Sequence, residues 1–440
     1  MKQYIDFFIS ERQKIDEFCS PLLNSFREKA FETFRQTGFP TYQSENYQYT
    51  DVAGLLKDDL GFYLNLLKPG INPHKVFHCN VPNLNAYKYF VVNGHFFQER
   101  ESDLPSGVYS GSLNVFAERY PDLFTRYYNQ PASQNGDGLT AFNTLFVQDG
   151  YVLYVPENVI LEKAVQLTNI SAGNIDSLIN RRILVILERG AQAKLLICDH
   201  TNEDKTMSAA TQVTEIYAGE DASFDYYELE ESSGNTVRLT NNFVRQSASS
   251  LVILNNITLS NGFTRNNYQI DLIGKRAESY LYGLAIADVQ QTVDNFTIIN
   301  HQASDCRSNE LFKYLLDDEA TGIFNGKMVV SPDAQKTEAY QSNRNLLGNR
   351  RCRMYSQPKL EINADDVKCS HGMTTGQLDE AALFYMRSRG IPNEEAVLML
   401  KFAFTGDVLK GIRLEGLRDR LKLLIEKRLR GELIKCRECI

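Results

Sequence analysis

Tryptophan is absent from this 440-residue sequence, and so are long uninterrupted apolar segments. No apolar run approaches the ~18 residues that a membrane-spanning helix needs, so we expect no membrane span. Residues 1–8 lack the basic stretch and apolar run of a secretory signal peptide, which indicates a cytoplasmic protein. In that reducing compartment the eight scattered cysteines are expected to be free thiols rather than a disulfide framework.

Positive charge is also in short supply. The sequence has 47 Lys and Arg against 55 Asp and Glu, which gives a formal net charge of −8. This balance argues against a general nucleic-acid-binding protein, which needs a basic surface for the phosphate backbone. Basic residues are in local excess near the C-terminus, over residues 413–437, where they could attract an acidic partner surface.

The hydrophobic pattern divides the chain into three parts. Residues 1–75 begin with apolar side chains at three- and four-residue steps, which predicts an N-terminal helical domain. Short apolar runs separated by Gly, Asn and Asp predict a β-rich core over residues 76–376, with a mixed leading segment at 76–150. The helical period returns in residues 377–440, which we expect to form a C-terminal helical domain.

The β-rich core carries a near-regular spacing of small residues. Ala222, Ala248, Ala277 and Ala303 follow polar turns at intervals of 26, 29 and 26 residues. This spacing favours stacked β-coils. A β-sandwich also uses many short strands, but more than 200 residues is long for one. We therefore expect a mostly β fold, a right-handed parallel β-helix flanked by N- and C-terminal helical domains, with coils and helices burying separate apolar faces.

Two potential metal ligands stand at the boundary between the β-rich core and the C-terminal helices. Cys369 and His371 are two residues apart at the close of a predicted strand over residues 359–369, so both side chains share one face. Thiol and imidazole groups bind iron and zinc. Two ligands cannot close a tetrahedral site, so the others would come from elsewhere in the fold or from a partner. The alternative is a buried cysteine beside a hydrogen-bonded histidine. Cys436 and Cys439 lack a second ligand pair and are expected to be free.

The sequence segments around this pair resemble segments of a known protein family. The stretches KCSHG (368–372) and FYMRSRGI (384–391) are similar to the C-terminal signature of the SufD branch of the SufB/SufD family of iron–sulfur cluster assembly proteins. GFPTYQSENYQYT (38–50) resembles a SufD hallmark, with Tyr47 where the family commonly has Trp. The stretch from 324 to 347 resembles the family's most recognisable core segment, and together the resemblances extend over nearly the whole chain.

The resemblance implies a non-catalytic subunit of a SufBCD complex. A β-helix of this kind would pair with a SufB-like scaffold, with Cys369 and His371 at the interface, while the C-terminal helices dock a SufC-like ATPase. The residues carried over for ATPase docking are Phe384, Tyr385, Arg387 and Arg389. The chain alone would bind no cofactor tightly, and iron or an iron–sulfur cluster would lie at the partner interface. In isolation, a homodimer is an alternative assembly.

Two other functions stay open at this stage. One is the SufB-like scaffold itself, but at the distance from His371 where SufB has its cluster-assembly cysteine this chain has Asn343. Gly372 replaces the second glutamate of the scaffold's Glu-His-Glu motif. The other is a β-helix carbohydrate-active enzyme, which needs acidic pairs in a groove. Asp317-Asp318 and Asp365-Asp366 are the pairs that the sequence offers.

Overall fold

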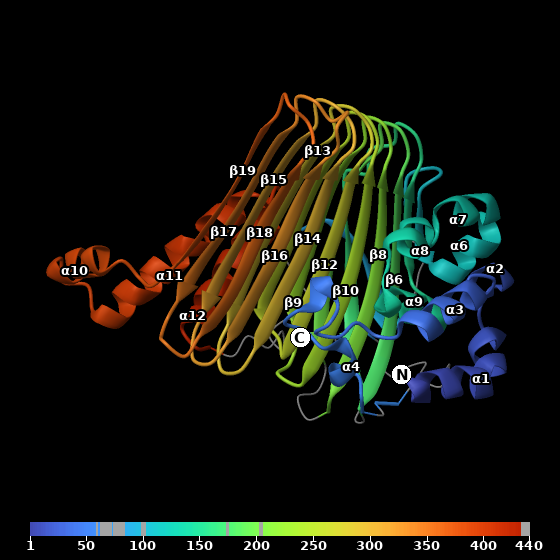
Figure 1. Cartoon of the computed structure of the whole chain (residues 1–440), viewed down its shortest axis with the longest axis horizontal. Coiled ribbons are helices and arrows are strands. Elements are labelled where there is room, and N and C mark those ends of the chain that lie inside the picture. The colour runs from blue at the N-terminus through green and yellow to red at the C-terminus, as the bar shows by residue number, and fades with distance from the viewer. Residues whose placement is uncertain are drawn as a thin grey trace.

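The chain folds into a β-solenoid with N-terminal helices on the outer face of one sheet and C-terminal helices on the outer face of the other (Figure 1). The computed structural model describes residues 1–58, 60–61, 73, 84–97, 103–172, 176–201 and 206–432. Successive strands alternate between two facing sheets, so each pair of strands and its corners make one coil. This architecture confirms the predicted parallel β-helix core with helices on either side.

Two sheets enclose the interior space of the solenoid, which we call the lumen. Sheet I contains ten strands in the order β2 (His95–Phe97), β1 (Ala86–Val92), β5 (Ala164–Ser171), β7 (Gln192–Thr201), β9 (Ser223–Glu231), β11 (Leu251–Ser260), β13 (Glu278–Ala287), β15 (Arg307–Leu316), β17 (Glu338–Leu347) and β19 (Lys368–Gly376). Sheet II contains nine, in the order β3 (Tyr109–Ser112), β4 (Tyr151–Val155), β6 (Ser177–Leu187), β8 (Ser208–Ala218), β10 (Thr236–Gln246), β12 (Phe263–Leu272), β14 (Thr292–His301), β16 (Thr321–Val330) and β18 (Arg353–Ile362). The pairing between coils is parallel, and the antiparallel pairs β1–β2 and β3–β4 stand where the solenoid begins.

The spacing of small residues marks one corner of the coils. Strand register puts Ala222 and Ala277 at equivalent positions, each directly before a strand of sheet I. Ser250 occupies this position in the coil between them, and Ala248 lies two residues earlier in the same corner. The residue before each equivalent position has a positive φ: Asp221 (56°), Ser249 (55°) and Arg276 (58°). The recurrence that predicted the solenoid therefore comes from a repeated tight corner rather than from the strands.

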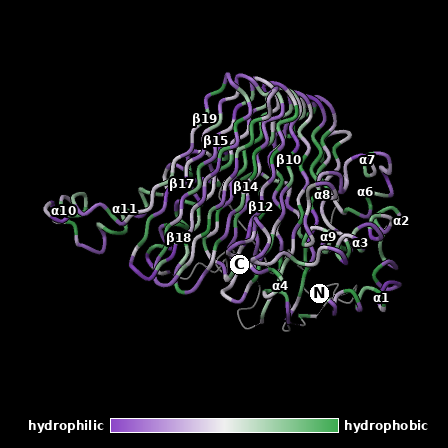
Figure 2. Tube along the Cα trace, viewed as in Figure 1, coloured by the Kyte–Doolittle hydropathy of each residue, from purple (hydrophilic) through white to green (hydrophobic). Residues whose placement is uncertain are grey.

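Side chains alternate between the lumen and the outer faces of the sheets. Figure 2 shows hydrophobic and hydrophilic positions interspersed along the strands. The largest apolar cluster fills the lumen with residues from both sheets, such as Leu195, Tyr226 and Phe324. The Asn93-Gly94 turn closes the β1–β2 hairpin with both residues at positive φ (49° and 86°), the conformation that this residue pair favours.

The lumen also buries charged groups in pairs. Arg238 is 1% exposed and contacts the carboxylates of Asp199 and Glu228. Arg181 donates a second hydrogen bond of 2.8 Å to Asp199. Because each of these charges has a partner of opposite sign, the low-dielectric lumen tolerates them.

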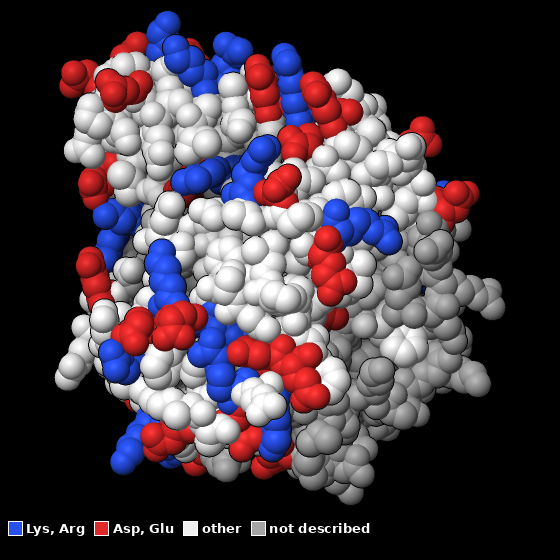
Figure 3. All heavy atoms as spheres, turned by 90° about the vertical axis from the view of Figure 1, so that its right-hand side faces the viewer, with Lys and Arg blue, Asp and Glu red and all other residues white. Residues whose placement is uncertain are grey.

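The N-terminal helices cover the outer face of sheet II over its first coils. They are α1 (Lys2–Glu17), α2 (Pro21–Asn24), α3 (Arg27–Thr37), α4 (Val52–Leu55), α6 (Leu113–Arg119), α7 (Pro121–Tyr127), α8 (Gln130–Asn135) and α9 (Gly138–Phe146), with a 3-10 turn at Glu45–Tyr47. Phe34 and Phe142 pack with Leu239 of the sheet. At this end of the molecule Figure 3 shows acidic and basic side chains intermixed, without a surface patch of one sign among the described residues in view.

The C-terminal segment forms α10 (Glu380–Ser388), α11 (Asn393–Lys410) and α12 (Glu415–Leu429). Leu409 and Leu421 are buried against Leu229 and Leu284 on the outer face of sheet I. The expectation that coils and helices bury separate apolar faces is therefore wrong, because the amphipathic helices use the outer surface of the sheet as their apolar partner. No helix within the described ranges is long and apolar enough to cross a membrane.

The last coil, β18 and β19, forms the open end of the solenoid. In β19 every residue is exposed or only partly buried, and β18 contains no buried residue. No further strand pairs with either of them in the described chain. Each therefore presents a row of backbone N–H and C=O groups along its outer edge. Solenoids normally cover such ends with a cap.

Candidate functional site

Cys369 and His371 lie at the beginning of the last strand. The predicted strand over residues 359–369 is wrong, because the chain turns between the end of β18 at Ile362 and the start of β19 at Lys368. The Lys336 N–H donates a hydrogen bond of 2.6 Å to the Asp366 carbonyl, which stacks this corner on the preceding one. The corner contains Asn363, Asp365 and Asp366, and it separates the predicted strand into parts of β18 and β19.

Strand register directs this pair of side chains toward the lumen. Cys369 pairs with Ala339 and His371 with Gln341, and both partners are buried in the lumen of the preceding coil. Cys369 is partly buried against the apolar core, whereas His371 is exposed at the open end. Burial raises the pKa of the Cys369 thiol, and a backbone hydrogen bond with Ala339 lowers it. The described residues contain no group of three or more His, Cys, Asp or Glu side chains that could hold a metal.

A polar contact lies behind His371, one coil deeper in the lumen. The Gln341 amide donates a hydrogen bond of 2.7 Å to the Glu310 carboxylate, and the two side chains are 3% and 0% exposed. Burial raises the pKa of the Glu310 carboxyl to about 7, while the nearby Thr297 hydroxyl and the hydrogen bond from Gln341 lower it. Gly326 makes room for this arrangement, since a Cβ there would lie 2.3 Å from the Gln341 amide nitrogen.

Sequence reasoning missed Glu310 and Gln341. Both stand at inward positions of their strands, in phase with buried Phe312 and Asn343. The two-residue alternation around Phe312 indicates this phase. Their contact, however, depends on the register of two strands that are separated by a full coil.

The position where the scaffold carries a cysteine is a structural asparagine here. Asn343 is fully buried, and its side-chain oxygen accepts hydrogen bonds from Asn345 (2.7 Å) and Ser356 (2.8 Å). The bond from Ser356 of β18 joins the two sheets inside the lumen, whereas Asn345 lies in the same strand as Asn343. The cysteine nearest to Asn343 along the chain is Cys352, which is buried and donates to the Leu316 carbonyl.

The predicted docking residues lie on or beside α10, which projects away from the solenoid beyond α11 (Figure 1). No residue of α10 is buried. Phe384 is 71% exposed and Tyr385 is 58% exposed. The Arg389 guanidinium lies 5.2 Å from the centre of the Tyr385 ring, Arg387 is in the last turn, and Gly390 ends the helix at φ 85°. This arrangement gives an exposed aromatic surface bordered by basic groups.

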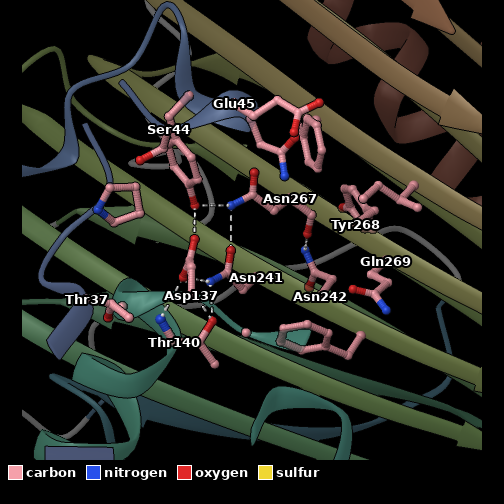
Figure 4. Close-up of a pocket in the computed structure, with 18 of the residues that line it drawn as sticks. Thr37, Ser44, Glu45, Asp137, Thr140, Asn241, Asn242, Asn267, Tyr268 and Gln269 are labelled. Atoms are coloured by element: carbon pink, nitrogen blue, oxygen red, sulfur yellow. Dashed lines mark hydrogen bonds between the residues drawn. The ribbon is translucent and has the colours of Figure 1, made fainter. Parts of the chain in front are cut away.

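The segment that resembles the SufD hallmark (38–50) covers a cavity of about 290 Å³ on the outer face of sheet II. Figure 4 shows how its side chains interlock. The Tyr47 hydroxyl donates to Asp137, while the Asn267 amide donates to Tyr47 (3.1 Å) and to Asn241 (2.5 Å). The Arg265 guanidinium lies 3.9 Å from the centre of the Tyr47 ring. Tyr47 therefore holds the N-terminal segment on the solenoid, which needs an aromatic ring but not tryptophan.

The other candidate residues from the sequence, the acidic pairs and the C-terminal cysteines, do not form a site among the described residues. Asp317, from one predicted acidic pair, forms a 2.6 Å ion pair with Lys401 of α11. Asp366, from the other, belongs to the corner described above. Both have structural contacts and neither faces an acidic groove. Cys436 and Cys439 lie outside the described residues.

Comparisons with known proteins find matches over most of the chain. Residues 1–167 match the family described as SufBD protein N-terminal region, and residues 169–404 match SUF system FeS cluster assembly, SufBD core domain. An iron–sulfur cluster assembly SufBD family protein of Synechocystis is 27% identical over 430 residues, covering 96% of this chain and 94% of that protein. The iron–sulfur cluster assembly protein SufD of Escherichia coli is 25% identical over 402 residues, 90% of each chain. SufD of Bacillus subtilis is 26% identical over 74% of each chain.

Proposed function

The chain belongs to the SufBD family of iron–sulfur cluster assembly proteins, and we propose that it acts there as the non-catalytic, SufD-type subunit. In this role the open end of the solenoid pairs with a SufB-like scaffold, and α10 docks a SufC-like ATPase. The observation that carries the proposal is the position of Cys369 and His371. Both stand on the uncovered last coil, where a partner would complete their surroundings.

The open end has the chemistry of a strand-pairing surface. Unpaired edges of β18 and β19 offer backbone donors and acceptors to strands of another chain. Apolar side chains near these edges are exposed: Tyr340 (42%), Ile362 (42%) and Met373 (47%). Burying them against a partner supplies apolar area in addition to the backbone hydrogen bonds. In the absence of a scaffold, a second copy of this chain offers the same surface, so a homodimer is the expected substitute.

Iron or a nascent cluster fits this interface as cargo. Cys369 supplies a thiol and His371 an imidazole, both suited to iron. Because these are two ligands, the partner must supply the remaining ones. A cluster built there would be shared between the two subunits.

The ATPase contact follows from the exposure of α10. Aromatic side chains as exposed as Phe384 and Tyr385 become favourable when a partner buries them, and such residues dominate interface energetics. Arg387 and Arg389 at the end of the helix add charge complementarity for an acidic partner surface. ATP-driven movement of the docked ATPase would then act on the subunit from one end, beside the last coil.

The test of the interface role is His371→Ala in a strain that depends on this system. Because His371 is exposed and makes no core contact, thermal stability and co-purification with the scaffold should stay near wild-type values. Activities of cluster-dependent enzymes should fall strongly. Lys368→Ala, an exposed neighbour in the same strand, is the matched control and should leave these activities unchanged. Normal cluster enzymes in the His371→Ala strain would contradict the proposal.

The docking role has its own test. Phe384→Ala combined with Tyr385→Ala should abolish co-purification of the ATPase while the scaffold still co-purifies. Val289→Ala, which changes an exposed apolar residue (62%) at a solenoid corner, is the control. If the double variant still retains the ATPase, α10 is not the docking surface.

A further inference from the structure

Over the last three coils of the solenoid, one column of inward-facing side chains changes from apolar to polar. One inward column runs, from coil to coil, through Leu254, Leu281, Glu310, Gln341 and His371. Its earlier members are apolar, and the switch to polar side chains occurs only next to the open end. Since apolar residues fill this column in the earlier coils, the fold does not require polar ones here.

Glu310 differs from the other carboxylates that are buried in the lumen. Asp199, Glu228 and Glu230 all contact Arg238. Glu310 contacts no cationic side chain in the part of the chain that the structure describes. Its hydrogen-bond partner is the neutral Gln341 amide, which leaves a buried carboxylate without a counter-charge.

Two buried oxygen atoms in this column have no hydrogen-bond partner. They are Oε1 of Glu310 and Oε1 of Gln341, which belong to side chains that are 0% and 3% exposed. Buried acceptors of this kind are costly unless something donates to them or coordinates them. The Gln341 amide nitrogen is already engaged with Glu310, so both free atoms can act as ligands to a cation.

We propose that Glu310 and Gln341 form an inner site for a divalent iron ion, reached through the open end past His371. The site rests on the proposed function, because it places an iron-holding position one coil behind the partner interface. A carboxylate oxygen, an amide oxygen and an imidazole form a donor set of the kind that ferrous iron accepts. The ion would supply the positive counter-charge that the Glu310 carboxylate lacks.

The geometry limits the ion to a position near Gln341. Neighbouring strands lie about 4.8 Å apart, so Glu310 and His371 are separated by about two such steps with Gln341 between them. An ion beside Gln341 would therefore lie about one strand spacing from Glu310 and one from His371.

The test measures metal binding by the isolated full-length chain. Under anaerobic conditions Fe²⁺ binding is followed by competition with a chromophoric chelator, and Mn²⁺ serves as a paramagnetic probe of the same site. Wild-type protein should bind one equivalent. Glu310→Gln should weaken binding by about ten-fold or more, since the charge is lost while the size is kept. Gln341→Leu should weaken it as well, and Glu361→Gln, an exposed acid of β18, should not.

Several outcomes would overturn the site. These are no binding by the wild-type chain, equal binding by all variants, and loss of binding only in His371→Ala, which would restrict iron to the interface. Co-purification with the scaffold is measured on the same variants and should be normal in all of them. A chain that binds iron as described but fails to pair with the scaffold would contradict the proposed function instead, so the two failures are distinguishable.

Discussion

Replacing Glu310 with glutamine should stabilise the metal-free protein at neutral and alkaline pH. The pKa of this carboxyl rises from 4.5 to about 7 on folding, because the lumen removes it from water. The folded state therefore holds a proton that the unfolded chain has already released. Stability is full below about pH 4.5, falls as the pH rises toward 7, and is then constant. The total loss is about 3 kcal/mol.

Glu310→Gln removes this loss because the amide has no charge to desolvate. In buffer containing a chelator, thermal unfolding of the variant and the wild type should coincide near pH 4.5. Above pH 7 the variant should unfold about 3 °C higher, for a chain of 440 residues that unfolds cooperatively. Differential scanning calorimetry across this pH range measures both quantities.

The matched control is Glu228→Gln in the same lumen. Glu228 contacts Arg238, so its replacement leaves part of a buried positive charge uncompensated and should destabilise the protein by about 3 kcal/mol. The same Glu→Gln substitution should therefore raise stability at Glu310 and lower it at Glu228. A Glu310→Gln variant that is less stable than the wild type at pH 8, or whose advantage does not grow with pH, would refute the assignment of Glu310 as a buried carboxylate without a counter-charge.

Two further predictions concern packing. Arg182 is fully buried and donates a 2.5 Å hydrogen bond to Glu215. Arg182→Met should lower the free energy of unfolding by about 3–5 kcal/mol, because it leaves the Glu215 carboxylate buried without its cationic partner. Arg189→Met on the surface should change the unfolding temperature little. Deleting residues 377–391, which include α10, should leave a folded protein with the wild-type oligomeric state in size-exclusion chromatography. Deleting residues 377–440 should cause aggregation, since it uncovers the apolar outer face of sheet I. A stable product of the longer deletion that does not aggregate would show that α11 and α12 are not needed to cover the sheet.

Local patterns were sufficient for the repeating part of the fold. Corners recur because each coil needs a tight turn, in which the residue directly before Ala222, Ser250 or Ala277 has a positive φ. The Asn93-Gly94 hairpin and the end of α10 at Gly390 were predictable for the same reason, since residues with positive φ are restricted by their own backbone. These features depend on a few neighbouring residues, which the sequence displays directly.

Long-range contacts were decided by the tertiary structure. Nothing in the sequence around Leu409 indicates that its helix packs on the outer face of sheet I rather than in a domain of its own. The spacing of Cys369 and His371 predicts that they share a face, but the register with Ala339 and Gln341 decides that this face is the lumen of the open end. The Glu310–Gln341 contact joins residues of neighbouring coils. Such contacts depend on how strands stack, and stacking is set by the sum of many side-chain interactions rather than by any local signal.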